Sequence, residues 1–98
     1  MALHPQIAAF AAQLDDLSRL LRSHGDRLWS DRIDLIHRMI ADSNFNGIER
    51  FLALFEGEAS FAAFTLGDVK ADSELDSCRA AARAMAQRLA KEEQSDRA

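Results

Sequence analysis

The chain has little of what β-sheets are made from. Tyrosine is absent and valine occurs once, at Val69, while nearly half of the 98 residues are apolar and alanine is the most common of them. Strands favour β-branched and aromatic residues, whereas helices favour alanine. The composition therefore predicts an all-α fold, a small irregular bundle of three main helices plus one or two short helices.

Cysteine occurs once, at Cys78, so no disulfide can form within the chain. The first residues show no basic stretch ahead of an apolar one, which a secretory signal would need. Gln13, Asp15 and Asp16 interrupt the longest apolar run well short of a membrane span. These absences predict a protein of the reducing cytoplasm that does not cross a membrane.

Positive charge is also in short supply, with 12 basic residues against 16 acidic ones and a formal net charge of −4. A phosphate backbone repels such a chain at long range, so we do not expect nucleic acid as a partner. Between residues 56 and 76 one lysine accompanies six carboxylates, which gives a local charge of −5: Glu56, Glu58, Asp68, Asp72, Glu74 and Asp76. This segment is either a solvated loop and helix start or an anionic docking surface for a basic partner.

A chain of 98 residues has room for one core, because a domain of this size buries only about two-thirds of its unfolded surface. We expect a single helical domain over residues 1–98. The tail at 92–98 has no apolar residue other than the terminal alanine, and we expect it to be frayed.

Apolar residues recur at helical spacing near both ends of the chain. A first helix is predicted from Pro5 to about Ser23, closed by Gly25, and a last helix with Ser73 as its N-cap. Their apolar rows are spaced three and four residues apart: Ile7, Phe10, Leu14, Leu17 and Leu21 in the first, Leu75, Cys78, Ala82, Met85 and Leu89 in the last. Either row could pair between two chains, but rows this short are typical of core-facing stripes. We expect the two helices to pack on each other through alanine-rich flanks.

The middle of the chain predicts a helix, a tight turn and a shorter helix. An apolar row widens into one broad face with its neighbours: Trp29, Ile33, Ile36 and Ile40, flanked by Leu28, Leu35 and Met39. Asp26 is a suitable N-cap, and the shorter helix at 46–56 ends before Gly57. We expect Trp29 in the core, with an exposed recognition residue as the alternative.

Residues 60–66 fit two interpretations. One is a short helical turn capped by Ser60, and the other is an irregular segment that folds Phe61, Phe64 and Leu66 onto the core. Residues 67–72 are predicted to be a polar link.

Several patterns that could carry chemistry are incomplete. The turn at 42–47 matches the start of a calcium loop, but Ala53 stands where a bidentate glutamate belongs, so we expect no metal. Asp34 and His37 are one helical turn apart and could form a general base with an orienting carboxylate. We expect a charged, solvent-exposed face on the last helix, formed by Asp76, Arg79 and Arg83. No phosphate-binding loop or nucleophile motif is present.

A pattern of single residues runs through the middle of the chain: Trp29, Ser43, Phe45, Gly47, Ile48, Glu49, Phe51, Leu52, Phe55, Gly57, Ser60 and Phe61. It resembles a family of short bacterial helical proteins of unknown function over about residues 20–66. The resemblance implies a helical fold in a bacterial cytoplasm and brings no catalytic or ligand residue. Residues 56–59 depart from the family, which has a glycine pair and Met-Gly there.

Because no catalytic constellation is evident, we expect a non-enzymatic protein that binds another protein and needs no cofactor. The specific hypothesis is an acidic immunity or inhibitor-type protein for a basic partner. Its docking residues would be Glu56, Glu58, Asp68 and Asp72. The alternatives are a homodimer formed through one of the two outer apolar rows, and a small-ligand sensor or enzyme that uses His37 and Asp34.

Overall fold

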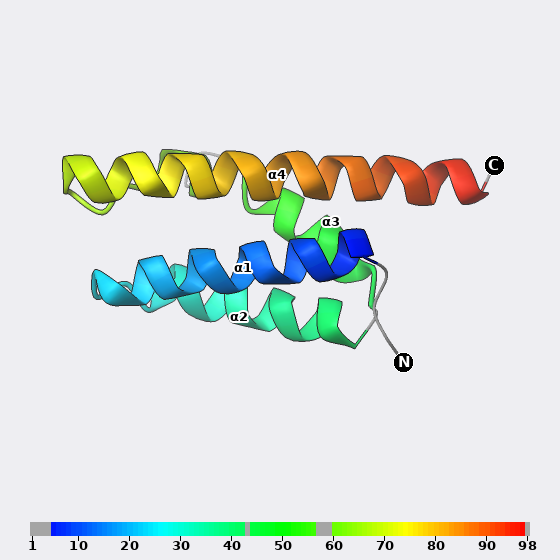
Figure 1. Ribbon diagram of the computed structural model, residues 1–98, viewed down its shortest axis with the longest axis horizontal. Coiled ribbons are helices and arrows are strands. Elements are labelled where there is room, and N and C mark those ends of the chain that lie inside the picture. The colour runs from blue at the N-terminus through cyan, green and yellow to red at the C-terminus, as the bar shows by residue number, and fades with distance from the viewer. Residues whose placement is uncertain (1–4, 43, 57–59, 98) are drawn as a thin grey trace.

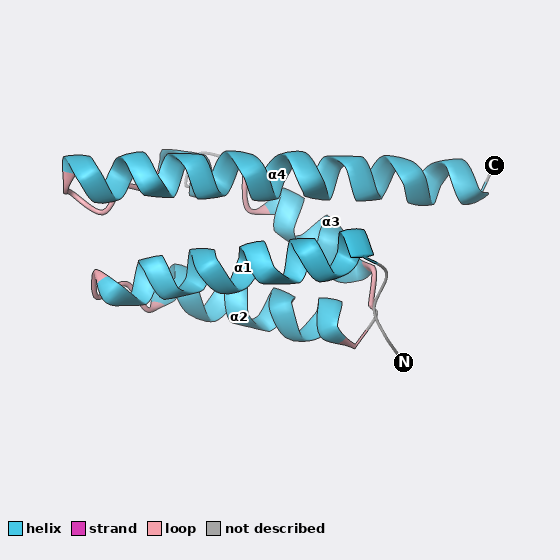
Figure 2. Cartoon of the chain, viewed as in Figure 1, coloured by secondary structure: helices cyan, strands magenta, loops and turns pink. Residues whose placement is uncertain are grey.

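The computed structural model describes residues 5–42, 44–56 and 60–97, with backbone alone for 93–97. The elements in chain order are α1 (Pro5–Ser23), α2 (Leu28–Ala41), α3 (Asn46–Ala53), the 3₁₀ turn η1 (Phe61–Ala63) and α4 (Val69–Arg97). No strand occurs among these residues, which confirms the all-α class (Figure 2). The described residues form four α-helices and one 3₁₀ turn, where three main helices with one or two short ones were predicted.

The helices form an elongated bundle with α1 in its middle. Figure 1 shows α1 between α2 on one side and α4 on the other, both antiparallel to it, while α3 crosses near the start of α1. Contacts join α1 to α2 and α4, and α3 to α2 and α4, so the predicted packing of the first helix on the last is confirmed. The 29 residues of α4 account for the long dimension of 43 Å.

The turn between α1 and α2 follows the local signals in the sequence. Gly25 has a φ of +82°, and hydrogen bonds from Gly25 to Arg22 and from Asp26 to Leu21 close α1 in a Schellman motif. The Asp26 carboxylate then accepts the backbone N–H groups of Trp29, at 3.0 Å, and Ser30, at 3.3 Å. The predicted cap of α2 by Asp26 is confirmed, and the two helices are held antiparallel.

The core lies where α1 meets the other helices and η1. Its largest fully buried side chains come from all five elements: Phe10, Leu14, Leu17, Leu21, Ile33, Ile40, Ile48, Phe51, Phe61 and Leu75. Both outer apolar rows therefore contribute to the core of one chain, and Trp29, 7% exposed, belongs to it as expected. The rows proposed for a homodimer contribute to the core of the single chain, and the homodimer itself stays a hypothesis.

Gly47 allows α2 and α3 to approach each other closely. A Cβ at this position would lie 3.0 Å from Cδ1 of Ile40 and 3.1 Å from Cβ of Met39. A side chain at this position would require Ile40 and Met39 to shift by a few tenths of an ångström in a closely packed contact. Gly47 thus has a packing role, and Asn44 supports the start of α3 by accepting the N–H of Asn46 at 3.0 Å.

The boundaries of the shorter helix and of α4 differ from the prediction. α3 ends at Ala53 rather than near Glu56, and Gly57, the expected stop, lies outside the described residues. α4 begins at Val69 instead of after Ser73, because Asp68 accepts the N–H of Ala71 at 2.9 Å and caps the helix one turn earlier. The predicted polar link at 67–72 is therefore mostly helix.

Two further expectations concern the last helix and the segment after α3. α4 continues to Arg97, and the expectation of a frayed tail at 92–98 stays a prediction. Residues 61–63 form a helical turn, and Phe61 is buried while Phe64 and Leu66 are half-buried against the core. Both proposed features of that segment are present, although the Ser60 side chain makes no capping hydrogen bond.

Candidate functional site

The four carboxylates proposed as a docking site have different roles. Glu56 is exposed just after α3, and Glu58 lies outside the described residues. Asp68 caps α4, and Asp72, which is half-buried, accepts the backbone N–H of Leu66. Both aspartates thus hold the start of α4 in place, where the helix dipole also favours them. The geometry gathers two of the four at one helix terminus and assigns them a structural role.

Asp76, Arg79 and Arg83 were predicted to form a solvent-exposed face of α4, and Arg79 departs from that prediction because it is buried. The residue is only 6% exposed, and Nη1 donates to the carbonyl oxygens of Phe61 and Phe64, the latter at 2.7 Å. Nη2 pairs with Asp76, and the guanidinium lies 5.4 Å from the centroid of the Phe61 ring. Arg79 therefore fastens η1 to α4 through charge-assisted hydrogen bonds.

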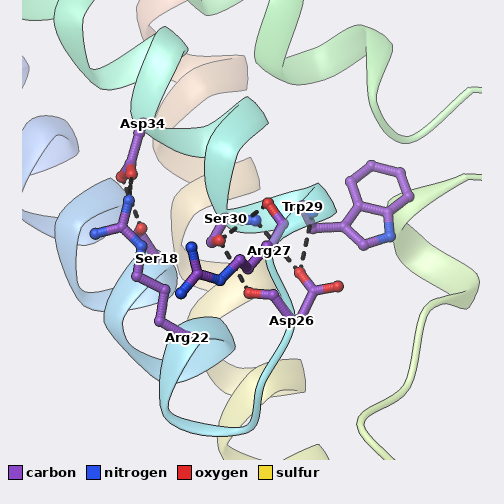
Figure 3. Close-up of polar contacts among 7 residues, drawn as sticks. All are labelled: Ser18, Arg22, Asp26, Arg27, Trp29, Ser30 and Asp34. Atoms are coloured by element: carbon purple, nitrogen blue, oxygen red, sulfur yellow. Dashed lines mark hydrogen bonds and ion pairs between the residues drawn. The ribbon is translucent and has the colours of Figure 1, made fainter.

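Asp34 does not form the proposed pair with His37. One of its oxygens accepts the Ser18 hydroxyl at 2.7 Å, and the other pairs with Arg22, so both contacts join α2 to α1 (Figure 3). His37 is half-buried on α2. The carboxylate expected to orient a general base instead connects two helices.

The described residues also lack the other site types that were considered. No group of three or more His, Cys, Asp or Glu in that part of the chain could hold a metal ion. Cys78 is half-buried beside a hollow of about 220 Å³ between α1 and α4, lined by Gln13, Asp16, Ser77 and Ala81 as well. Burial raises the pKa of the Cys78 thiol, and the carboxylates of Asp16 and Glu74 raise it further. This thiol is poorly suited to act as a nucleophile.

An aromatic cluster packs the inner side of α2 against η1 and the residue that follows it. Trp29 stacks on Phe61 with ring centroids 4.8 Å apart and lies 6.0 Å from Phe64. On the outer side of α2, the Arg32 guanidinium lies 4.9 Å from the centroid of the Trp29 ring. Trp29 thus packs inward on η1 while it also supports an arginine at the surface.

The outward face of α2 carries exposed apolar residues. Leu28 is 60% exposed and Leu35 is 46% exposed, so the broad apolar face predicted for this helix is only partly covered. The two leucines are seven residues apart and therefore share one side of the helix, with Arg32 between them. We call Leu28, Arg32 and Leu35 the outer row of α2.

A hollow of about 310 Å³ adjoins this row between α2 and α3. We call it the α2–α3 groove, and it is lined by four apolar residues and two arginines: Leu35, Ile36, Ala53, Leu54, Arg32 and Arg50. Sequence reasoning placed Leu28 and Leu35 on the broad apolar face of this helix and did not single out this surface. The available signal was that seven apolar positions on α2 make a stripe wider than one neighbouring helix can cover.

A larger hollow, of about 400 Å³, lies at the turn between α1 and α2 and is lined by Arg22, Gly25, Arg27 and Asp31. Its lining side chains, Gly25 aside, are charged, and Arg22 is already paired with Asp34. Pockets that bind ligands are mostly apolar with a few polar groups. The α2–α3 groove fits that description better and is the candidate functional site.

No protein-family model matches the chain, and neither a curated protein nor a solved structure matches it. The resemblance to the short bacterial proteins therefore stays a prediction. Within the described ranges, no helix is both long enough and apolar enough to cross a membrane. The function has to be inferred from the surfaces of the fold.

Proposed function

We propose that the chain is a non-enzymatic protein-binding protein that docks its partner on the outer row of α2 and the α2–α3 groove. The observation that supports this is the exposure of Leu28 and Leu35, at 60% and 46%, beside an apolar hollow. Single exposed leucines are common on protein surfaces. Two on one helix face, next to a groove with an apolar floor, are typical of an interaction site.

Arg32 adds to this surface the residue type that interfaces favour. Its guanidinium is placed over the Trp29 ring at 4.9 Å, so the side chain is partly ordered before any partner binds. An ordered arginine loses less conformational entropy on binding, and arginine is enriched among the residues that contribute most to affinity.

Partner capture with surface variants tests this proposal. The tagged chain and a Leu35→Glu variant are used to capture proteins from the native cell's lysate at about 50 mM salt, where charge contacts are weakly screened. We expect one stoichiometric partner with the wild-type chain and its loss with Leu35→Glu. The matched control is Val69→Glu, because Val69 is 90% exposed at the start of α4. Equal capture by both variants, or no partner for the wild-type chain, contradicts the proposal.

A second candidate is the acidic immunity or inhibitor-type function with a basic partner. It is supported by the exposure of Glu56 and Asp68 within the segment of charge −5. Asp68→Asn keeps a good N-cap and removes the charge, so it can be combined with Glu56→Gln without loss of the cap. If this candidate holds, the double variant associates with its partner severalfold more slowly at low salt. Unchanged association kinetics would remove the acidic segment from the interface.

A further inference from the structure

We propose that the α2–α3 groove takes an acidic amphipathic helix of a partner protein. This inference rests on the proposed function and adds the chemistry of the partner. It depends on three properties of the groove: the shape and polarity of its lining, its continuation along α2, and the sign of the charge at its edge.

The groove offers an apolar floor with space for apolar side chains. Ile36, 2% exposed, lies at its base, Leu35 and Ala53 are exposed, and Leu54 is half-buried. A volume of about 310 Å³ is in the range of sites that hold bulky side chains. A concave apolar site of this kind fits protruding side chains of a partner protein better than the flat interface of a membrane.

The apolar surface continues along α2 in a direction that suits a helix. Leu28 and Leu35 are separated by seven residues, a distance of about 10 Å along the helix axis at 1.5 Å per residue. A partner helix with apolar residues at i, i+3, i+4 and i+7 covers a similar length. An amphipathic helix of two to three turns can therefore contact both the groove and Leu28.

The charge at the edge of the groove selects an acidic partner. Arg32 and Arg50 are the only charged residues among the described lining residues, and both are exposed. Asp31 and Glu49 adjoin them in sequence but do not line the groove. Carboxylates of a partner can form bidentate contacts with the two guanidinium groups, while lysine or arginine at the same positions would be repelled.

Titration of the isotope-labelled full-length chain with two synthetic peptides tests this inference. Each peptide has about 16 residues, enough to form a helix, and carries leucine at i, i+3, i+4 and i+7. The remaining positions are glutamate and alanine in one peptide, and lysine and alanine in the other. We expect the glutamate peptide to shift amide resonances of α2 and α3 in a saturable way, and the lysine peptide to bind at least about tenfold more weakly.

Variants separate charge recognition from apolar contact. We expect Arg32→Gln combined with Arg50→Gln to weaken the glutamate peptide about tenfold, and Leu35→Glu to weaken both peptides. The control is Arg88→Gln, which removes an exposed arginine of α4 and should leave the affinity unchanged. Amide exchange spectra of each variant confirm that it is folded.

Several outcomes overturn the inference. Equal binding of the two peptides, shifts confined to other helices, or no binding at millimolar peptide would each do so. Self-association of the chain through this face, seen by sedimentation, or Leu35-dependent binding to anionic lipid vesicles without peptide binding would also overturn it. If a captured partner depends on Leu35 but not on Arg32 and Arg50, this inference fails while the proposed function stands.

Discussion

α1 and α2 are joined by one turn and both carry apolar rows, but they bury those rows to different extents. The α1 row from Ile7 to Leu21 is buried along its whole length, since α2 covers it on one side and α4 on the other (Figure 1). On α2 the inner row is buried, while Leu28 and Leu35 remain exposed. The difference shows that the extent to which its neighbours cover a helix, and not its apolar content alone, decides which residues form the core.

The same contrast appears among the arginines. Arg79 on α4 is covered by η1 and donates to two backbone carbonyl groups. Arg32 on α2 has an aromatic ring beneath it and solvent above it. A buried arginine of the first kind stabilises the fold, whereas an exposed one of the second kind is available to a partner.

The largest expected effect is a loss of stability on truncation of a buried leucine of α1, compared with an exposed leucine of α2. Leu14 on α1 is fully buried, so Leu14→Ala should lower the free energy of unfolding by about 2–5 kcal/mol. Leu35→Ala should lower it by less than about 0.5 kcal/mol, because Leu35 is half exposed and contributes little packing. Urea denaturation followed by circular dichroism measures both. Similar losses for the two variants would mean that Leu35 packs as a core residue.

A second prediction concerns the buried arginine. Arg79→Gln should lower the free energy of unfolding by about 2–4 kcal/mol, because the Phe61 and Phe64 carbonyl groups lose a charged donor. Trp29 stacks on Phe61, so its fluorescence should change together with stability. Arg83, whose guanidinium lies over Phe55 at the surface, is the control, and Arg83→Gln should cost no more than about 1 kcal/mol.

Arg79→Lys refines this prediction. A lysine offers one compact ammonium group where arginine offers a fork of donors, so it should restore only part of the lost stability. Full stability of the lysine variant would show that charge alone, rather than the geometry of the two contacts, holds η1 on α4.

The smallest expected effect is on the alkylation rate of Cys78, which reports how well the packing of α1 on α4 shields this thiol from solvent. The pKa of its thiol is raised above 9.0 by burial and by the carboxylates of Asp16 and Glu74. Alkylation requires the thiolate, so the folded chain should react more slowly than the urea-unfolded chain at pH 8, and the midpoint of its rate should lie at higher pH. Because the folded state disfavours the thiolate, the stability contributed by this group is full below the unfolded pKa and falls as pH rises above it.

Neutral replacements at the two carboxylates provide the control for the thiol. Asp16→Asn with Glu74→Gln should move the alkylation midpoint towards lower pH, and the remaining shift measures the effect of burial, the larger cause. Identical midpoints in the folded and unfolded wild-type chain would show that the contact is open at Cys78.

Local features of the fold could be predicted from the sequence wherever neighbouring residues suffice to cause them. Gly25 and Asp26 end one helix and begin the next through contacts within a few residues, and both were predicted. The start of α4 was misplaced by one turn because Asp68 and Ser73 are both acceptable caps. The earlier cap is the one used, since Asp68 accepts the Ala71 N–H, and Asp72 in the first turn accepts the N–H of Leu66 from the preceding segment.

The candidate site could not be predicted in the same way. The acidic segment is visible in the sequence, but whether a carboxylate caps a helix or faces solvent depends on where the helix begins. The α2–α3 groove combines residues of two helices, and Leu35 and Ile36 are equally apolar in the sequence although one is exposed and the other buried. Their difference arises because Ile36 lies in the inner row of α2, which the bundle covers, whereas Leu35 lies in the outer row.

By itself, the sequence determined the helical class, the apolar rows of α1 and α4, and the turn at Gly25, because these follow from propensity, spacing and contacts within a few residues. Only the tertiary structure decided which side of α2 is covered, that Arg79 is buried under η1, and that Asp34 joins α1 rather than His37. These outcomes depend on residues from 15 to 18 positions away, whose approach is set by how the whole bundle packs.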